Sequence, residues 1–265
     1  MITFLQAIIL GVVQGITEFL PISSDGHLAL LQYFFNFKAS NLAYDVLLHF
    51  ATLLVIVIYF RNNLWEILAK FFLFLKSKKQ EDFPMIIFFL ALATIPIALV
   101  GFLVKDYIDV IFANPKITGA GFLFTAVFMF LAQSQKQTTK TLKSLNFKDS
   151  LWIGFVQTLA LLPGVSRSGS TIFAGLSRKF NHTDVFNFSF LLAIPAILGA
   201  QILYIPEILQ TPTAELPQYL VGFLVAFITG FFALSILKNF VVGRKLYYFG
   251  IYCLVLGVIT LVLIK

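Results

Sequence analysis

Residues 11–27 read GVVQGITEFLPISSDGH, and residues 154–171 read GFVQTLALLPGVSRSGST. In each segment an apolar run carries a glutamine, meets a proline and then turns through serine and glycine. Proline ends a helix, and serine and glycine form turns and cap the helix that follows. Each segment is therefore predicted to form two short helices that meet at a tip.

The composition places both segments in a membrane protein. Of the 265 residues, 59% are hydrophobic and only 12% are charged, whereas about a quarter are charged in an average soluble domain. This excludes a soluble enzyme and a disordered regulator, and the single cysteine, Cys253, excludes a secreted disulfide scaffold. The net charge of +7 fits basic loops beside lipid headgroups. Nucleic acid is not expected as a partner, because no basic face interleaved with aromatic residues is found.

Six apolar stretches approach the roughly 20 residues that a helix needs to cross the hydrocarbon core. They are Ala43–Phe60, Met85–Val104, Ile117–Ala132, Val185–Ile205, Gln218–Leu237 and Leu246–Ile264. The segments 2–37 and 151–176 are interrupted by polar groups and breaks, so we expect re-entrant hairpins there, lining a wet cavity. The amphipathic stretch Leu64–Leu75 is predicted to lie in the membrane interface.

The order of these elements predicts an internal repeat. Residues of about 1–140 and 150–265 each hold one hairpin followed by three spans, within a single integral membrane domain covering 1–265. Because each half crosses the membrane an odd number of times, the halves are expected to be inverted relative to each other. The predicted fold class is an all-α polytopic membrane protein with an inverted repeat. This architecture is also typical of transporters, so a lipid-phosphate flippase remains an alternative function.

Basic residues indicate the orientation. The loops 61–84, 133–150 and 238–245 together carry twelve Lys and Arg residues, against two in the loops 105–116 and 206–217. Cytoplasmic loops are enriched in Lys and Arg, so the first set is predicted to be cytoplasmic.

The first tip carries candidate chemistry. Gln14 and Glu18 are four residues apart on one helix face and could begin a shell for a divalent cation, or simply hydrogen-bond to each other. Ser23 and Ser24 lie close to His27, which would suit a nucleophile with its base, although serines also cap helices. Asp45 and His49, again four apart, are expected to support the first tip together with Asp25, or to form an internal hydrogen bond.

The second tip is predicted to bind an anion. It offers Arg167 and several hydroxyls at a helix start, where free N–H groups and the arginine fork favour phosphate. The candidates are Gly164, Ser166, Arg167, Ser168 and Thr171, with Ser23 from the first tip. The competing interpretation is a hydroxyl-rich cap with Arg167 reaching the headgroups. A phosphoester or pyrophosphate on a lipid would fit between the two tips.

The two tips resemble the two signature motifs of the undecaprenyl-diphosphate phosphatase family associated with bacitracin resistance. Residues 45–49 (DVLLH) and 188–195 (FSFLLAIP) also resemble that family. The resemblance implies an enzyme of the bacterial inner membrane that removes the terminal phosphate of undecaprenyl diphosphate and so recycles the lipid carrier for peptidoglycan synthesis. It also implies a site that opens to the outer face, a divalent cation (Mg or Ca) and a homodimer.

The resemblance further implies residue roles. Glu18 would be the essential acid, Ser24 the nucleophile, His27 its base and Arg167 the phosphate-binding arginine, with Ser166, Ser168 and Thr171 around it. Two positions depart or vary: Gln14 stands where the family has Glu or Gln, and Asp25 stands where a small hydroxyl residue is expected.

Overall fold

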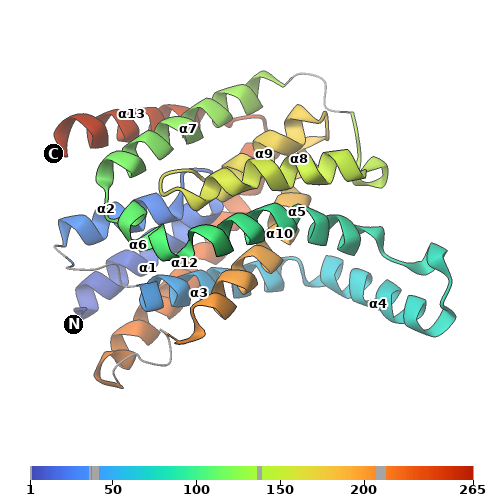
Figure 1. Ribbon diagram of the computed structural model, residues 1–265, viewed down its shortest axis with the longest axis horizontal. Coiled ribbons are helices and arrows are strands. Elements are labelled where there is room, and N and C mark those ends of the chain that lie inside the picture. The colour runs from blue at the N-terminus through green and yellow to red at the C-terminus, as the bar shows by residue number, and fades with distance from the viewer. Residues whose placement is uncertain (1, 36, 38–41, 136–138, 207–212, 265) are drawn as a thin grey trace.

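The structure, a computed structural model, describes residues 2–35, 37, 42–135, 139–206 and 213–264 (Figure 1). Within these ranges it consists of α-helices and short 3-10 helices and contains no β-strand, which confirms the all-α prediction. The first part of the chain forms α1 (Phe4–Phe19), α2 (Ser24–Phe34), α3 (Leu42–Tyr59), α4 (Arg61–Ser77), α5 (Met85–Val104), α6 (Ile108–Phe112) and α7 (Pro115–Ser134). The rest forms α8 (Phe147–Thr158), α9 (Arg167–Ser177), α10 (His182–Leu203), α12 (Leu216–Val242) and α13 (Tyr247–Leu263).

Several of these helices are built to cross a membrane. By length and composition, four described segments are long and apolar enough to cross a membrane: Met85–Tyr107, Pro115–Ser134, His182–Leu203 and Leu216–Val242. A fifth span is formed if α3 and α4 count together, although they bend by 73° at their junction. The 17 residues of α13 extend about 26 Å, slightly less than the hydrocarbon core of ~30 Å. The chain is therefore a multi-pass membrane protein, and the number of six spans stays a prediction.

The helix boundaries differ in detail from the predicted ones. Helix α7 begins two residues before the expected Ile117, because Asn114 caps it and Pro115 occupies its first position. Helix α10 begins at His182, which is only 8% exposed. The sequence around His182, with Lys179 and Asn181, predicts a solvated loop. This prediction is wrong, because Asn181 caps α10 and His182 lies in its first turn.

The two halves pack on each other reciprocally. Hairpin helix α1 packs along α12, and the corresponding α8 packs along α5, so each hairpin lies on a span of the other half. The glycines of the shared GxxQ pattern allow this. A Cβ on Gly11 would lie 3.2 Å from the Cα of Gly222, and one on Gly154 would lie 2.9 Å from the Cα of Ala93. The inverted orientation of the halves stays a prediction.

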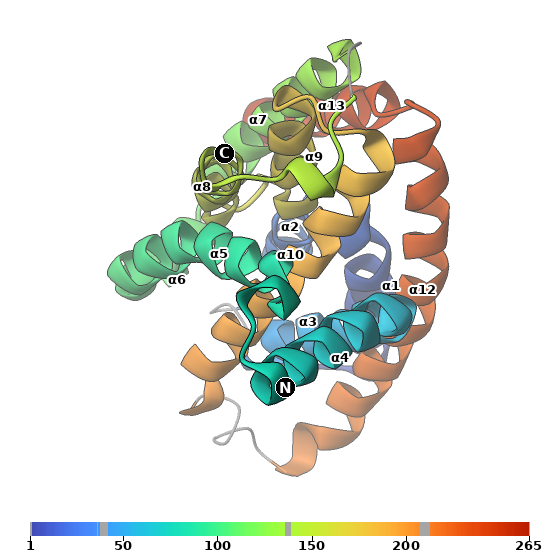
Figure 2. The same ribbon diagram turned by 90° about the vertical axis from the view of Figure 1, so that its right-hand side faces the viewer.

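Helix α2 of the first hairpin lies inside the bundle. In Figure 2, α12 runs along one side and α5 lies toward the other, with α2 between them and α7 and α13 together at the top. Helix α4 extends away from the bundle in Figure 1, has no buried residue and exposes Trp65 and Phe72. The prediction of a helix at Leu64–Leu75 is confirmed. Its apolar exposed side chains suit the membrane interface, and that location stays a prediction.

Candidate active site

The first tip forms where α1 meets Pro21. Helix α1 ends at Phe19, and after the turn Ser23 adopts φ 69° and ψ 99°, a conformation that non-glycine residues rarely take. The Ser23 hydroxyl caps α2 by accepting a hydrogen bond from the Gly26 N–H at 3.2 Å. This strained turn sets Ser24 in the first turn of α2 beside the end of α1.

The second tip is held by α7. Gly164 turns the chain with φ +89°, and the Ser166 hydroxyl caps α9 by accepting from the Gly169 N–H at 3.1 Å. The Thr125 hydroxyl of α7 donates to the Gly164 carbonyl at 2.7 Å and accepts from the Ser166 N–H at 2.8 Å. One threonine therefore holds both sides of the turn and sets Arg167 at the start of α9.

The two tips face each other, as the sequence predicted, and they also touch. A Cβ on Gly26 would lie 2.7 Å from the Cα of Gly164, so only glycine allows this approach. The Ser168 hydroxyl of the second tip donates to the Phe19 carbonyl at the end of α1 at 3.2 Å. Residues separated by about half the chain thus line one site.

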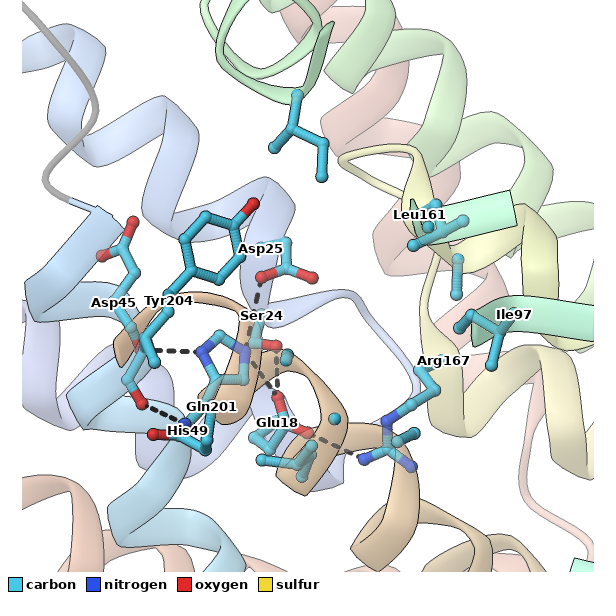
Figure 3. Close-up of a pocket in the computed structure, with 18 of the residues that line it drawn as sticks. Glu18, Ser24, Asp25, Asp45, His49, Ile97, Leu161, Arg167, Gln201 and Tyr204 are labelled. Atoms are coloured by element: carbon cyan, nitrogen blue, oxygen red, sulfur yellow. Dashed lines mark hydrogen bonds and ion pairs between the residues drawn. The ribbon is translucent and has the colours of Figure 1, made fainter. Parts of the chain in front are cut away.

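Glu18 is the centre of that site (Figure 3). Its Oε2 accepts from the Ser24 hydroxyl at 2.5 Å, and its Oε1 accepts from Arg167 Nη2 at 2.8 Å. The Nε2 of His49 lies 3.3 Å from Glu18 Oε2. The carboxylate is therefore buried between two basic groups while it touches a serine hydroxyl.

His49 links this carboxylate to a second one. Its Nε2 also lies 3.3 Å from Asp25 Oδ1, and its Nδ1 lies 2.8 Å from the backbone carbonyl of Asp45. Carbonyl and carboxylate oxygens accept hydrogen bonds, so a proton on either ring nitrogen of His49 has an acceptor. The Asp45 carboxylate itself accepts from Gln32 Nε2 at 2.7 and 2.8 Å.

A cavity of about 250 Å³ opens onto this cluster. Its polar side is formed by Glu18, Ser23, Ser24, Asp25, Asp45, His49, Ser166 and Arg167. Its other side is mostly apolar and includes Ile97, Ala98, Ile108, Phe112, Leu161 and Ile197. Arg167 Nη1 is buried and has no hydrogen-bond partner among the described residues. The cavity thus combines a spare guanidinium donor with an apolar wall, which suits an anionic head on a lipid tail.

His27 faces away from this cavity. Its Nδ1 lies 2.6 Å from the Ser23 carbonyl, and its Nε2 lies 2.7 Å from the Tyr252 hydroxyl of α13. The His27 ring also stacks on the Tyr252 ring, with centroids 5.7 Å apart. It lines a separate groove with residues of α1, α12 and α13. The structure brings Glu18, Ser24 and Arg167 together, and it engages both nitrogens of His27 elsewhere.

The remaining predicted residues lie behind the cavity surface. Gly164 contacts α7, Ser168 contacts the end of α1, and Thr171 pairs with Ser189 at 2.5 Å. Of the predicted phosphate-binding residues, Ser23, Ser166 and Arg167 line the cavity.

The sequence reasoning missed some cavity residues. Gln201 near the end of α10 and Tyr204 directly after the helix line the cavity, and Gln201 Nε2 donates to the Val46 carbonyl at 2.6 Å. The available signal was the neutral amide of Gln201 within an apolar span, since the residues predicted at membrane depth were chiefly charged ones.

The predicted metal ligands do not fit a resident ion in this arrangement. Gln14 points its Nε2 at Glu18 Oε2, at 3.3 Å, and its Oε1 is buried without a partner among the described residues. Both oxygens of Glu18 already contact basic groups. Within the described ranges, no three His, Cys, Asp or Glu side chains are grouped to hold a metal. The divalent cation stays a prediction from the resemblance.

Comparison with known proteins identifies the family of the chain. Residues 7–259 match the family described as bacitracin resistance protein BacA. The chain belongs to the bacitracin resistance protein BacA family. Three relatives, each named undecaprenyl-diphosphatase, illustrate the likeness. The chain is 39% identical to one from Methanococcus vannielii, over 94% of this chain and 96% of that protein. It is 38% identical to one from Carboxydothermus hydrogenoformans, over 97% and 96% of the two chains. It is 35% identical to one from Gemmatimonas aurantiaca, over 97% of both chains.

The BacA match covers both tips and the helices between them, so it extends over the whole candidate site. The family predicted from the two motifs is confirmed. The relatives described above are all named for diphosphate hydrolysis, and none is named for transport.

Proposed function

We propose that the chain hydrolyses undecaprenyl diphosphate to undecaprenyl phosphate and inorganic phosphate. The observation that carries this proposal is the meeting of the Ser24 hydroxyl, the Glu18 carboxylate and the Arg167 guanidinium in one cavity. These groups are a nucleophile, a proton acceptor and an anion-binding fork, which are the parts that phosphoryl transfer needs. The physiological role follows from the activity: return of the lipid carrier to peptidoglycan synthesis, and resistance to bacitracin.

Binding begins with the terminal phosphate. Its oxygens replace Glu18 as acceptors for part of the Arg167 fork and take the unpartnered Nη1. Ser166 and Arg167, at the start of α9, line this cavity, and the positive end of the helix dipole there favours an anion. The apolar side of the cavity, from α5, α6 and α10, accommodates the first part of the prenyl chain.

The chemical step uses the contact between Ser24 and Glu18. The Ser24 proton passes to Glu18 Oε2, 2.5 Å away, while Oγ attacks the terminal phosphorus. The bridging P–O bond breaks, and undecaprenyl phosphate leaves with the electron pair. Water then attacks the phosphoserine and the Ser24 Oγ–P bond breaks. Glu18 returns its proton to Ser24 Oγ, and the protons of the water leave with inorganic phosphate. Because His27 is engaged with Tyr252, Glu18 takes the role of base that the resemblance implies for His27.

The proposed location is the bacterial inner membrane, with the cavity open to the outer face. The excess of Lys and Arg in the loops 61–84, 133–150 and 238–245 supports this orientation. The later half of α5 and helix α6 line the cavity, on the side of the basic-poor loop 105–116. A homodimer, as the resemblance implies, belongs to the same proposal and is tested by the mass of the purified protein in detergent.

The test is phosphate release from undecaprenyl diphosphate by the purified protein in detergent. Ser24→Ala should lose nearly all turnover and the phosphoserine that acid quenching and mass spectrometry detect in wild type. Ser235→Ala is the matched control, because that hydroxyl lies on the exposed face of α12 and donates to the Phe231 carbonyl. Assays with added Mg or Ca and with a chelator test the divalent cation.

Two results would overturn the proposal in different ways. Lipid movement across vesicles without phosphate release would replace hydrolysis by transport. Substantial turnover by Ser24→Ala, together with its loss in His27→Ala, would remove the covalent step and restore His27 as the base.

A further inference from the structure

The contact between Asp25 and His49 has no part in the proposed reaction. We infer that Asp25 is a positioning residue, which holds His49 so that Glu18 stays directed at Ser24. This inference rests on the proposed function and concerns how the chain keeps its base in place.

The geometry sets His49 between two carboxylates from two hairpin helices. Nε2 lies 3.3 Å from Glu18 Oε2 at the end of α1 and 3.3 Å from Asp25 Oδ1 in the first turn of α2. The other end of the ring is fixed, because Nδ1 contacts the Asp45 carbonyl one turn earlier in α3, at 2.8 Å. The position of Nε2 is therefore a balance between two attractions of the same kind and length.

This balance matters because the Glu18 oxygen that faces His49 also contacts the Ser24 hydroxyl. Oε2 accepts the Ser24 hydroxyl and also faces His49, while Oε1 faces Arg167. Side-chain exposure is 5% for Glu18, 18% for His49 and 35% for Asp25, so Asp25 is the member nearest to solvent. Without Asp25, His49 keeps Glu18 as its only carboxylate partner in this cluster. The stronger pull on Oε2 then competes with the Ser24 hydroxyl.

Loss of Asp25 also changes the charge that a diphosphate meets. Arg167 faces the cavity with Glu18 and Asp25, and the Asp45 carboxylate is hydrogen-bonded to Gln32. Removing one carboxylate from this wall makes it more attractive to an anion. The inference therefore predicts that turnover and KM fall together, whereas general damage to the site would raise KM.

Asp25→Thr is the main test, because threonine restores the small hydroxyl residue that the family resemblance leads us to expect and should fold. We expect kcat for undecaprenyl diphosphate to fall roughly tenfold and KM to fall severalfold. In a His49→Gln background the same change should alter kcat by less than about twofold, because the group that Asp25 positions is gone. Asp25→Asn keeps an acceptor of the same size and should lie between wild type and Asp25→Thr.

Asp106→Thr is the matched control, since Asp106 is exposed in the 3-10 helix Lys105–Tyr107 and is not part of the cavity wall. Each variant is first checked for an unchanged Tm in detergent. Additive effects of Asp25→Thr and His49→Gln on kcat, or a raised KM in Asp25→Thr, would overturn the inference alone. Absence of turnover in both wild type and Asp106→Thr would overturn the proposed function and, with it, the inference.

Discussion

Two buried carboxylates in this molecule each lie between two basic groups, and they are used differently. Glu18 contacts Arg167 at 2.8 Å and His49 at 3.3 Å. Asp149 in α8 contacts Lys140 at 2.8 Å and Arg178 at 2.7 Å, and its side chain is fully buried. Judged by charge and distance alone, the two clusters look equivalent.

Their surroundings separate them. The Asp149 oxygens each contact a cation, and Lys140 and Arg178 extend outward, with side chains 31% and 41% exposed. This cluster ties the segment before α8 to the end of α9 and lines none of the described cavities. Glu18 instead lines a cavity, touches a serine hydroxyl and has a partner, Arg167, with an unused buried donor. Unsatisfied groups beside a cavity, rather than a buried ion pair, mark the reactive cluster.

Replacing the arginine of each cluster by alanine, one at a time, tests this comparison most strongly. Arg167→Ala should lower kcat/KM roughly 10³-fold, or about 4 kcal/mol, because the phosphate loses its main donor. Arg178→Ala removes the same charge from the other cluster and should leave kcat/KM within about threefold of wild type. Phosphate release from undecaprenyl diphosphate measures both. Equal losses in the two variants would mean that the clusters do not differ in role.

Removal of the Asp149 carboxylate should instead lower stability and leave activity unchanged. Asp149→Asn leaves Lys140 and Arg178 without their charged acceptor, at a cost of about 2 kcal/mol for charge-assisted hydrogen bonds. We expect Tm in detergent to fall by roughly 5 °C while turnover per folded molecule stays unchanged. An unchanged Tm together with reduced turnover would place Asp149 in the reaction and contradict the comparison.

The smallest expected effect concerns the contact between His27 and Tyr252. Tyr252→Phe removes the hydroxyl that contacts His27 Nε2 and should lower turnover about fivefold, or roughly 1 kcal/mol, because the first tip loses its tie to α13. In a His27→Ala background the same change should have no further effect. Additive losses would show that Tyr252 acts on the site by a route other than His27.

Much of this site could be predicted because its signals are local. Proline at 21 and 163 ends a helix wherever the rest of the chain lies, and Ser23 and Ser166 cap the helices that follow. The spacing of Gln14 and Glu18 sets them on one helix face, and the structure joins them by a hydrogen bond at 3.3 Å. Arg167 at a helix start was recognisable for the same reason.

The partners of the two histidines were not predictable in this way. His27 is three residues from Ser24, but its ring turns toward Tyr252, 225 positions away in the chain. His49 was expected to support the tip, but the sequence did not show that its Nε2 would contact both Glu18 and Asp25. Proximity in the sequence could not decide which imidazole faces the cavity, because the position of α13 and α3 against the hairpin decides it.

The sequence by itself determined the membrane class, the two broken helices and the chemical groups at their tips, because hydropathy, proline breaks and helix caps act over a few residues. Only the tertiary structure decided which of those groups meet. The close contact of Gly26 with Gly164 and the packing of each hairpin on the other half bring Glu18, Ser24, His49 and Arg167 to one cavity. The same packing turns His27 away from that cavity, because contacts between distant segments depend on how whole helices pack.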